Sequence, residues 1–231
     1  MNYTIVAPQP LQALIAHRLS HSGIRYQLNH CSDDHHPTSL AFVTTSPADT
    51  PATTYQTDIE FLALPTPQAP EHGFILAAAG SISALQRSTP LLDTLAPIAQ
   101  GWLHIGDIGA AHFAAQIWQI LLGSNTNPAD FLPFWQNTQR HFTQQTPNQA
   151  ELIASLAQQT QAQAQQCQDM QHLATAFLLR HPEHAFTPYH PQQRSFFGPY
   201  SETHISPAHQ LAKLIMLLPI QPETTIVPIN Q

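Results

Sequence analysis

The chain has 231 residues, which is enough for one large domain or two small ones with a substantial core. Charged residues make up only 9%, against roughly 25% in ordinary globular chains, and the formal net charge is −7 with seven Lys and Arg residues. A nucleic-acid-binding surface is therefore not expected, because such a surface gathers cations against phosphates.

Three further features bear on location. The start of the chain has no basic segment ahead of an apolar stretch, so no signal peptide is expected. The sequence contains no run of about 18 apolar residues that would predict a membrane span. Two distant cysteines, Cys31 and Cys167, suggest no disulfide framework. We therefore expect a cytoplasmic protein without a membrane partner.

The first thirty residues predict a strand, a helix and a second strand. Residues 3–7 have the apolar character of a buried strand, and residues from about 11 to 21 place leucines and an isoleucine on one helical face. Gly23 ends this helix, and residues 24–29 form the next predicted strand. This order is typical of the opening βαβ half-unit of a dinucleotide-binding fold.

The first turn of such a fold carries the pattern G-x-G-x-x-G, which lets the backbone approach a pyrophosphate. Here the three glycine positions hold Ala7, Gln9 and Gln12. Pro8 and Pro10 also lack the amide hydrogens that would bind phosphate. The sequence therefore predicts weak or absent NAD(P)H binding, with no cofactor assigned.

Asn29-His30-Cys31 stands at the end of the second predicted strand, where a dinucleotide-binding fold contacts the ribose, and a protonated His30 could contact the 2′-phosphate of NADP, the cofactor expected if any binds. The candidate cofactor-contacting residues are Ala7, Pro8, Gln9, Asn29, His30 and Thr44. The following Ser32-Asp33-Asp34-His35-His36 is interpreted as a solvated turn rather than a metal site.

Further strands are predicted at residues 39–45, 58–65 and 73–80, and residues 101–104 close the sheet. Ser81 is a natural N-cap for a helix over residues 82–95. The pattern then changes at a glycine pair, Gly106 and Gly109. An Ala-rich helix starts at Ala110, and later helices are predicted from about residue 146 to 179 and from Ser206-Pro207 to 218.

These elements predict an α/β plus all-α protein. A truncated Rossmann-like domain would cover residues 1–106, and a helical domain would cover residues 107–231. The irregular stretch 182–206 is rich in Pro, His and aromatic residues, and it either wraps a partner, seals a cleft or packs as a surface loop. No metal site is predicted from its histidines, whose spacing repeats no known ligand pattern. The stretch contains His184, His190 and His204, and His181 and His209 flank it.

The segment His104 to Leu122 resembles the hinge and interdomain helix of the β-hydroxyacid dehydrogenase family, relatives of 3-hydroxyisobutyrate and 6-phosphogluconate dehydrogenases. His104-Ile105-Gly106 and Gly109-Ala110 match the family pattern. The catalytic Lys position of the family falls on Ala115, and the Asn position falls on Gln119. The resemblance implies an NAD(P)-dependent oxidoreductase scaffold whose helical part builds a homodimer.

Three parts of the family machinery depart together: the nucleotide glycines, the Lys-Asn pair and a Ser-Gly-Gly substrate loop, whose positions hold Pro67, Gln68 and Ala69. We therefore expect a catalytically degenerate relative that is retained for binding a small molecule or for an interaction. The alternative is an atypical NADP-dependent reductase of a small hydroxy acid or imine, in which His112 supplies a displaced acid.

Overall fold

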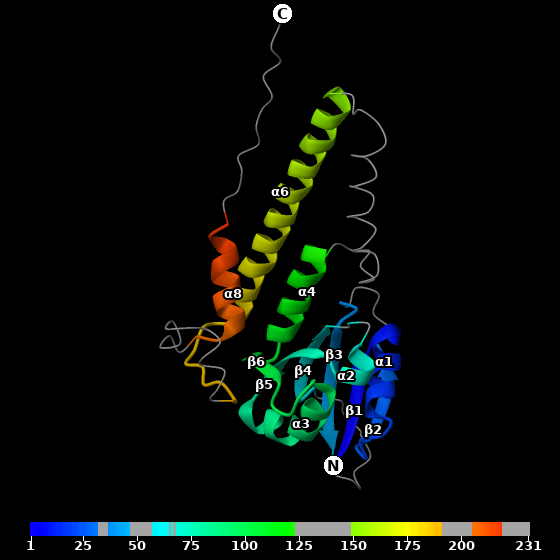
Figure 1. Ribbon diagram of the computed structural model, residues 1–231. Helices are drawn as coiled ribbons and strands as arrows, with labels where there is room; N and C mark the ends of the chain where they lie inside the picture. Colours follow the sequence, from blue (N-terminus) through cyan, green and yellow to red (C-terminus); the bar gives the residue numbers. More distant parts are fainter. Residues whose placement is uncertain are drawn as a thin grey trace, which may run out of the picture.

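The computed structural model describes residues 1–31, 37–46, 57–64, 66, 68–122, 149–190 and 205–218 (Figure 1). Within these residues the fold is mixed α/β, with one six-stranded sheet in the order β2-β1-β3-β4-β5-β6. The strands are β1 (Asn2–Ala7), β2 (Arg25–His30), β3 (Leu40–Ser46), β4 (Ile59–Leu64), β5 (Ile75–Gly80) and β6 (Trp102–Gly106). The helices are α1 (Gln9–Leu19), α2 (Ala69–His72), α3 (Ile82–Leu95), α4 (Ala110–Leu122), α6 (Gln149–Arg180) and α8 (Pro207–Met216).

The predicted opening unit is confirmed, because β1 and β2 are parallel neighbours joined by α1. The sheet is not parallel throughout: β3 runs antiparallel to both β1 and β4, and β4 is antiparallel to β5. The connection of residues 31–39 explains the reversal of β3, since a parallel return needs a crossover of about a dozen residues or more. The final pair, β5 and β6, is parallel again and is connected through α3.

Both faces of the sheet are covered. Alternate residues of the strands, such as Ile5 and Phe61, join a core with α1 and α3. The opposite face, which includes Leu62 and Ile105, joins a second core with α4, α6 and α8. The helices that follow the hinge therefore share a core with the sheet, and the division into two domains at residue 106 stays a prediction.

The long helix α6 extends away from the sheet (Figure 1). Its end lies against α4, where the rings of Phe113 and Phe177 stack at a centroid distance of 4.4 Å. It also contacts α8, because Gln171 Nε2 donates to the carbonyl oxygen of Ile215 at 3.4 Å and to that of Leu218, just after α8, at 2.8 Å. In the described ranges, all strands precede Asp107 and the later elements are helices.

The helix starts that the sequence predicts are confirmed at two serines. Ser81 Oγ accepts the backbone N–H of Ala84 at the start of α3, and Ser206 Oγ accepts that of His209 at the start of α8. Each serine satisfies one of the amides that an α-helix leaves without an internal partner. No helix within the described ranges combines the length and apolar character that crossing a membrane requires.

A buried carboxylate joins the sheet to α4. Glu60 is the second residue of β4 and is only 2% exposed. Its Oε1 accepts the backbone N–H groups of Gly109 at 2.5 Å, Ala111 at 2.9 Å and His112 at 3.3 Å. Burial raises the pKa of Glu60, and these three hydrogen bonds act in the opposite direction. One side chain thus satisfies the amides at the start of the helix from the face of the sheet.

We expect Glu60→Leu to lower the free energy of unfolding by about 3 kcal/mol, because three amides lose their acceptor in a buried place. Glu60→Gln keeps an oxygen acceptor and should lose less than half as much. Urea denaturation followed by circular dichroism measures both, with the exposed Glu71→Gln as the matched control. Equal stability of Glu60→Leu and the unmodified protein would show that this junction does not anchor α4.

Candidate functional site

The turn between β1 and α1 brings five of the six cofactor candidates to one edge of the sheet. Ala7 ends β1 and pairs with His30, and Asn29 pairs with Val6. Pro8 and Gln9 follow directly, where α1 begins without a side-chain cap. The carboxyl ends of two parallel strands meet there, which is the ligand-binding edge of open α/β sheets.

The turn is filled from within by Gln12. Its Nε2 donates to the carbonyl oxygen of Ala7 at 2.9 Å and to that of Asn29 at 2.6 Å. The backbone N–H of Cys31 also donates to Ala7, at 3.1 Å. One carboxamide therefore ties together the ends of β1 and β2, where a dinucleotide-binding turn needs bare backbone for the pyrophosphate.

Thr44 does not reach this edge, which corrects its assignment as a cofactor contact. It pairs with Thr4 in the antiparallel ladder between β1 and β3. Because β3 runs opposite to β1, the carboxyl end of β3 lies beside the amino end of β1. The prediction rested on a parallel third strand ending beside the cofactor, and the reversed direction removes that geometry. Residues 32–36, interpreted as a solvated turn, and Pro67 of the substrate-loop positions lie outside the described residues.

The hinge is held by His104, which is 3% exposed. Its Nδ1 accepts the backbone N–H of Tyr189 at 3.2 Å, and its Nε2 lies 3.1 Å from the carbonyl oxygen of Gly106. A carbonyl only accepts, so Nε2 carries the proton and the ring is neutral. Burial lowers the pKa of His104 to about 4.

The second hinge glycine, Gly109, has a φ of 99°. A side chain there would collide with the ring of His181. Two constraints therefore require glycine at this position: the positive φ, and the close approach of the ring of His181, which directly follows α6. The histidine and glycines that carry the family resemblance are accounted for here by packing at the start of α4.

The lowered pKa of His104 makes stability depend on pH. In the unfolded chain a histidine takes up a proton near pH 6.5, whereas the folded protein resists protonation of His104 until about pH 4. Its contribution is thus present above pH 6.5 and is lost as the pH falls to about 4, amounting to about 3 kcal/mol. We expect the His104→Gln variant to lose less stability over this interval than the unmodified protein. Thermal unfolding at a series of pH values measures both slopes, and equal slopes would contradict the assignment.

The structure separates the two positions that correspond to the family Lys and Asn. Ala115 is fully buried among α4, α6, α8 and the sheet, whereas Gln119 is exposed. They do not share a cleft-facing surface as expected, because the neighbours of a helix change from one turn to the next. His112 is half-buried one turn before, and its backbone N–H contacts Glu60.

Placing the family lysine at residue 115 should therefore damage the fold. We expect Ala115→Lys to reduce the free energy of unfolding by about 3 kcal/mol or more, because an ammonium group would enter an apolar core without a partner. The matched variant Gln119→Lys, one turn later on the exposed surface, should remain within about 0.5 kcal/mol of the unmodified protein. Chemical denaturation compares the two, and equal stabilities would contradict the burial of Ala115.

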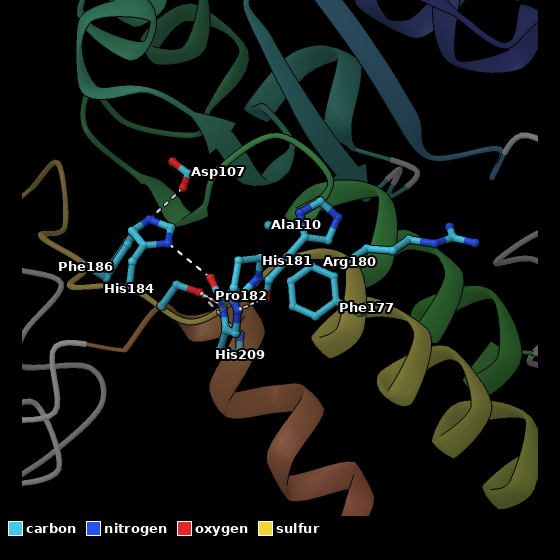
Figure 2. A pocket seen from close by; sticks show the side chains of 10 residues that line it. Asp107, Ala110, Phe177, Arg180, His181, Pro182, His184, Phe186 and His209 are labelled. Atoms are coloured by element: carbon cyan, nitrogen blue, oxygen red, sulfur yellow. Dashed lines mark hydrogen bonds and ion pairs between the residues drawn. The ribbon is translucent and has the colours of Figure 1, made fainter.

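A pocket of about 230 Å³ lies where the start of α4, the end of α6 and the start of α8 meet. Figure 2 shows side chains from these three segments converging on it. Its lining combines rings, histidines and small residues: Asp107, Ala110, Phe177, Arg180, His181, Pro182, His184, Phe186, Ser206 and His209.

Two buried side chains form a hydrogen-bonded chain in the wall of this pocket. Ser206 Oγ lies 2.7 Å from His209 Nδ1, and His209 Nε2 lies 2.7 Å from the carbonyl oxygen of His181. The carbonyl accepts, so Nε2 carries the proton and Nδ1 accepts from the serine hydroxyl. The sequence identified Ser206 only as a helix cap. The spacing of Ser and His three residues apart at a helix start was the available signal.

Two further histidines line the pocket, His184 and His181, and neither side chain belongs to the hydrogen-bonded chain of Ser206 and His209. His184 Nε2 contacts Asp107 Oδ2 at 2.8 Å on the exposed rim of the pocket (Figure 2). The ring of His181 stacks on Phe177, and burial lowers the pKa of His181, helped by nearby His209 and Arg180.

His190 lies apart from the pocket and packs edge-on against Trp102 at a centroid distance of 4.5 Å. Within the described residues, no three His, Cys, Asp or Glu side chains are arranged to hold a metal ion. His204 lies outside those residues.

Comparison with protein-family models, with curated proteins and with solved structures found no match to this chain. The class that the structure defines is thus a mixed α/β protein with a histidine-lined pocket beside its hinge helix.

Proposed function

We propose that this protein is a catalytically silent relative of the NAD(P)-dependent β-hydroxyacid dehydrogenases, with a Rossmann-like sheet retained for binding or interaction. The observation that carries the proposal is the carboxamide of Gln12, which occupies the turn where a dinucleotide would lie. Its two hydrogen bonds, to Ala7 and Asn29, satisfy the ends of β1 and β2 without any ligand.

The hinge helix supports the same proposal. Hydride transfer to or from a hydroxy acid needs a group that moves the hydroxyl proton. The position of the family lysine holds Ala115, which is buried in a core and has no titratable group. Gln119 carries an amide that neither gains nor loses a proton near neutral pH. The two losses, at the turn and at the helix, affect separate steps of the same reaction.

Calorimetric titration with NADPH tests the proposal directly. We expect the purified protein to give no saturable heat, because the turn offers a filled space and two prolines instead of free amides. Saturable binding in the low micromolar range, displaced by NADP, would overturn the proposal. Asn29 and His30 would then be the first positions to substitute.

A pair of variants separates the causes. In Gln12→Gly the carboxamide is removed, whereas in Gln9→Gly an exposed side chain of the same type is removed from the same turn. A gain in NADPH binding only in Gln12→Gly assigns the exclusion to the carboxamide. No gain in either variant assigns it to Pro8 and Pro10 and removes Gln12 as the carrying observation.

The reductase alternative predicts a different result. A screen of 3-hydroxy acids, keto acids and imines with NADPH should then show turnover in the unmodified protein, and His112→Ala should reduce it. Turnover of this kind would contradict the hypothesis of a catalytically silent protein and would support an NADP-dependent reductase that uses a displaced acid.

The proposal also includes a homodimer, as the family resemblance implies, and a cytoplasmic location, as the sequence features predict. Exposed apolar side chains on the helices support it, since Leu121 of α4 is 54% exposed and Leu217, just after α8, is 78% exposed. Sedimentation equilibrium of the full chain distinguishes a dimer from a monomer.

A further inference from the structure

The pocket beside the hinge contains the elements of a nucleophilic site, independent of the function proposed above. We propose that Ser206 and His209 act as nucleophile and base toward short carboxylic esters that enter this pocket. A serine hydroxyl reacts when an adjacent base accepts its proton and a third group orients that base. Here the base is His209 Nδ1, 2.7 Å from Ser206 Oγ, and the orienting group is the carbonyl oxygen of His181.

The orientation of His209 is determined from both sides. Its Nε2–H donates to His181, so the ring cannot present the wrong tautomer to the serine. The same carbonyl stabilises the imidazolium that forms when Nδ1 takes the hydroxyl proton. The ring also packs against Phe177 at a centroid distance of 5.1 Å, which restricts its rotation. The pair is thus organised before any ligand arrives.

Burial and access are both suited to this chemistry. Ser206 and His209 are each 6% exposed, and both line the pocket, which gives an ester its route to the hydroxyl. Gly106 lies beside the serine, and a side chain there would come within 3.3 Å of Ser206 Oγ and 2.9 Å of Ala110 Cβ. Close packing of β6 against Ala110 and Ser206 therefore requires glycine at this position.

The start of α8 favours the reactive state of the serine. Ser206 is the N-cap residue, and its Oγ accepts the backbone N–H of His209 at 3.3 Å. The positive end of the helix and this hydrogen bond stabilise negative charge that develops on the oxygen. The same serine therefore serves as cap and as nucleophile, and the experiment must separate these two roles.

The lining indicates the class of substrate. Phe177, Phe186 and Ala110 provide apolar walls for a small acyl or aryl group, whereas the guanidinium group of Arg180 points away from the pocket (Figure 2). A volume of about 230 Å³ favours a short ester over a long acyl chain. No redox cofactor enters this chemistry.

The reaction balances with water as the second substrate. Ser206 gives its proton to His209 Nδ1, and Oγ forms a bond with the ester carbonyl carbon. The bond from that carbon to the leaving oxygen breaks, and the leaving alcohol takes the proton from His209. Water then gives a proton to His209 Nδ1, and its oxygen forms a bond with the acyl carbon. The bond from that carbon to Ser206 Oγ breaks, Oγ takes the proton back from His209, and the carboxylic acid leaves.

The test uses p-nitrophenyl acetate with the full chain. We expect release of p-nitrophenol and an acetyl group on Ser206, located by mass spectrometry of peptides from the trapped protein. Ser206→Asn keeps a good N-cap residue but lacks a nucleophile, and His209→Gln keeps a polar side chain that cannot accept the proton. Both should lower the rate by at least about 100-fold.

Three comparisons exclude a purely structural effect. His172→Gln, at an exposed position of α6 that does not line the pocket, should retain the rate of the unmodified protein. Thermal unfolding should show that Ser206→Asn stays folded, and Ser206→Cys should restore a nucleophile at the same position, detected as an acetyl thioester. Acetylation elsewhere in the chain, or an unchanged rate in Ser206→Asn, would overturn the proposal, as would the lack of any Ser206 adduct in the unmodified protein. None of these readouts involves NADPH, so they are independent of the cofactor experiment.

Discussion

The fold depends on the contact between one carboxylate of the sheet and the start of the hinge helix. Glu60 is the only acidic residue in the apolar strand β4, and three amides at the start of α4 converge on its Oε1. A buried carboxylate without these donors would be costly, and so would buried amides without an acceptor. Each group removes the cost of the other, which determines where α4 leaves the sheet.

The helices that follow are placed by this junction. Helix α4 packs on the sheet, and α6 packs on α4 through the stacked rings of Phe113 and Phe177. Helix α8 joins the same core. His104 and Gly109 allow close packing at the start of α4. His104 accepts a hydrogen bond from the backbone of Tyr189, and Gly109 leaves room for the ring of His181. The pocket exists because these three helices meet at one place, and the hinge segment forms its base.

At the β1–α1 turn and at the hinge, a side chain of the protein forms hydrogen bonds with backbone groups. At the β1–α1 turn the carboxamide of Gln12 satisfies the strand ends, and at the hinge Glu60 satisfies the amides of α4. In a dinucleotide-binding protein, backbone groups at such a turn are left for the ligand. At the β1–α1 turn of this protein the Gln12 side chain lies in that position instead and bonds to the carbonyl oxygens of Ala7 and Asn29. The pocket beside Ser206 is different, because its buried polar pair faces an open space.

The sequence by itself determined the local elements, because periodicity and caps are properties of neighbouring residues. The helix over residues 82–95 and its Ser81 cap, the parallel β1–α1–β2 unit and the helical chain after the hinge all follow from such patterns. The residue identities also show that Gln9, Gln12 and Ala115 stand at positions where the family resemblance would lead one to expect two glycines and a lysine.

Only the tertiary structure decided the features that join distant segments. The reversal of β3, which moves Thr44 away from the cofactor edge, is decided by the antiparallel pairing of β3 with β1. The burial of Ala115 depends on which helices pack over it. Glu60 and Gly109 lie 49 positions apart, and His181 and His209 lie 28 apart, so no local pattern brings either pair together. Local propensity acts along the chain, whereas these contacts are determined by the packing of the two cores against one sheet.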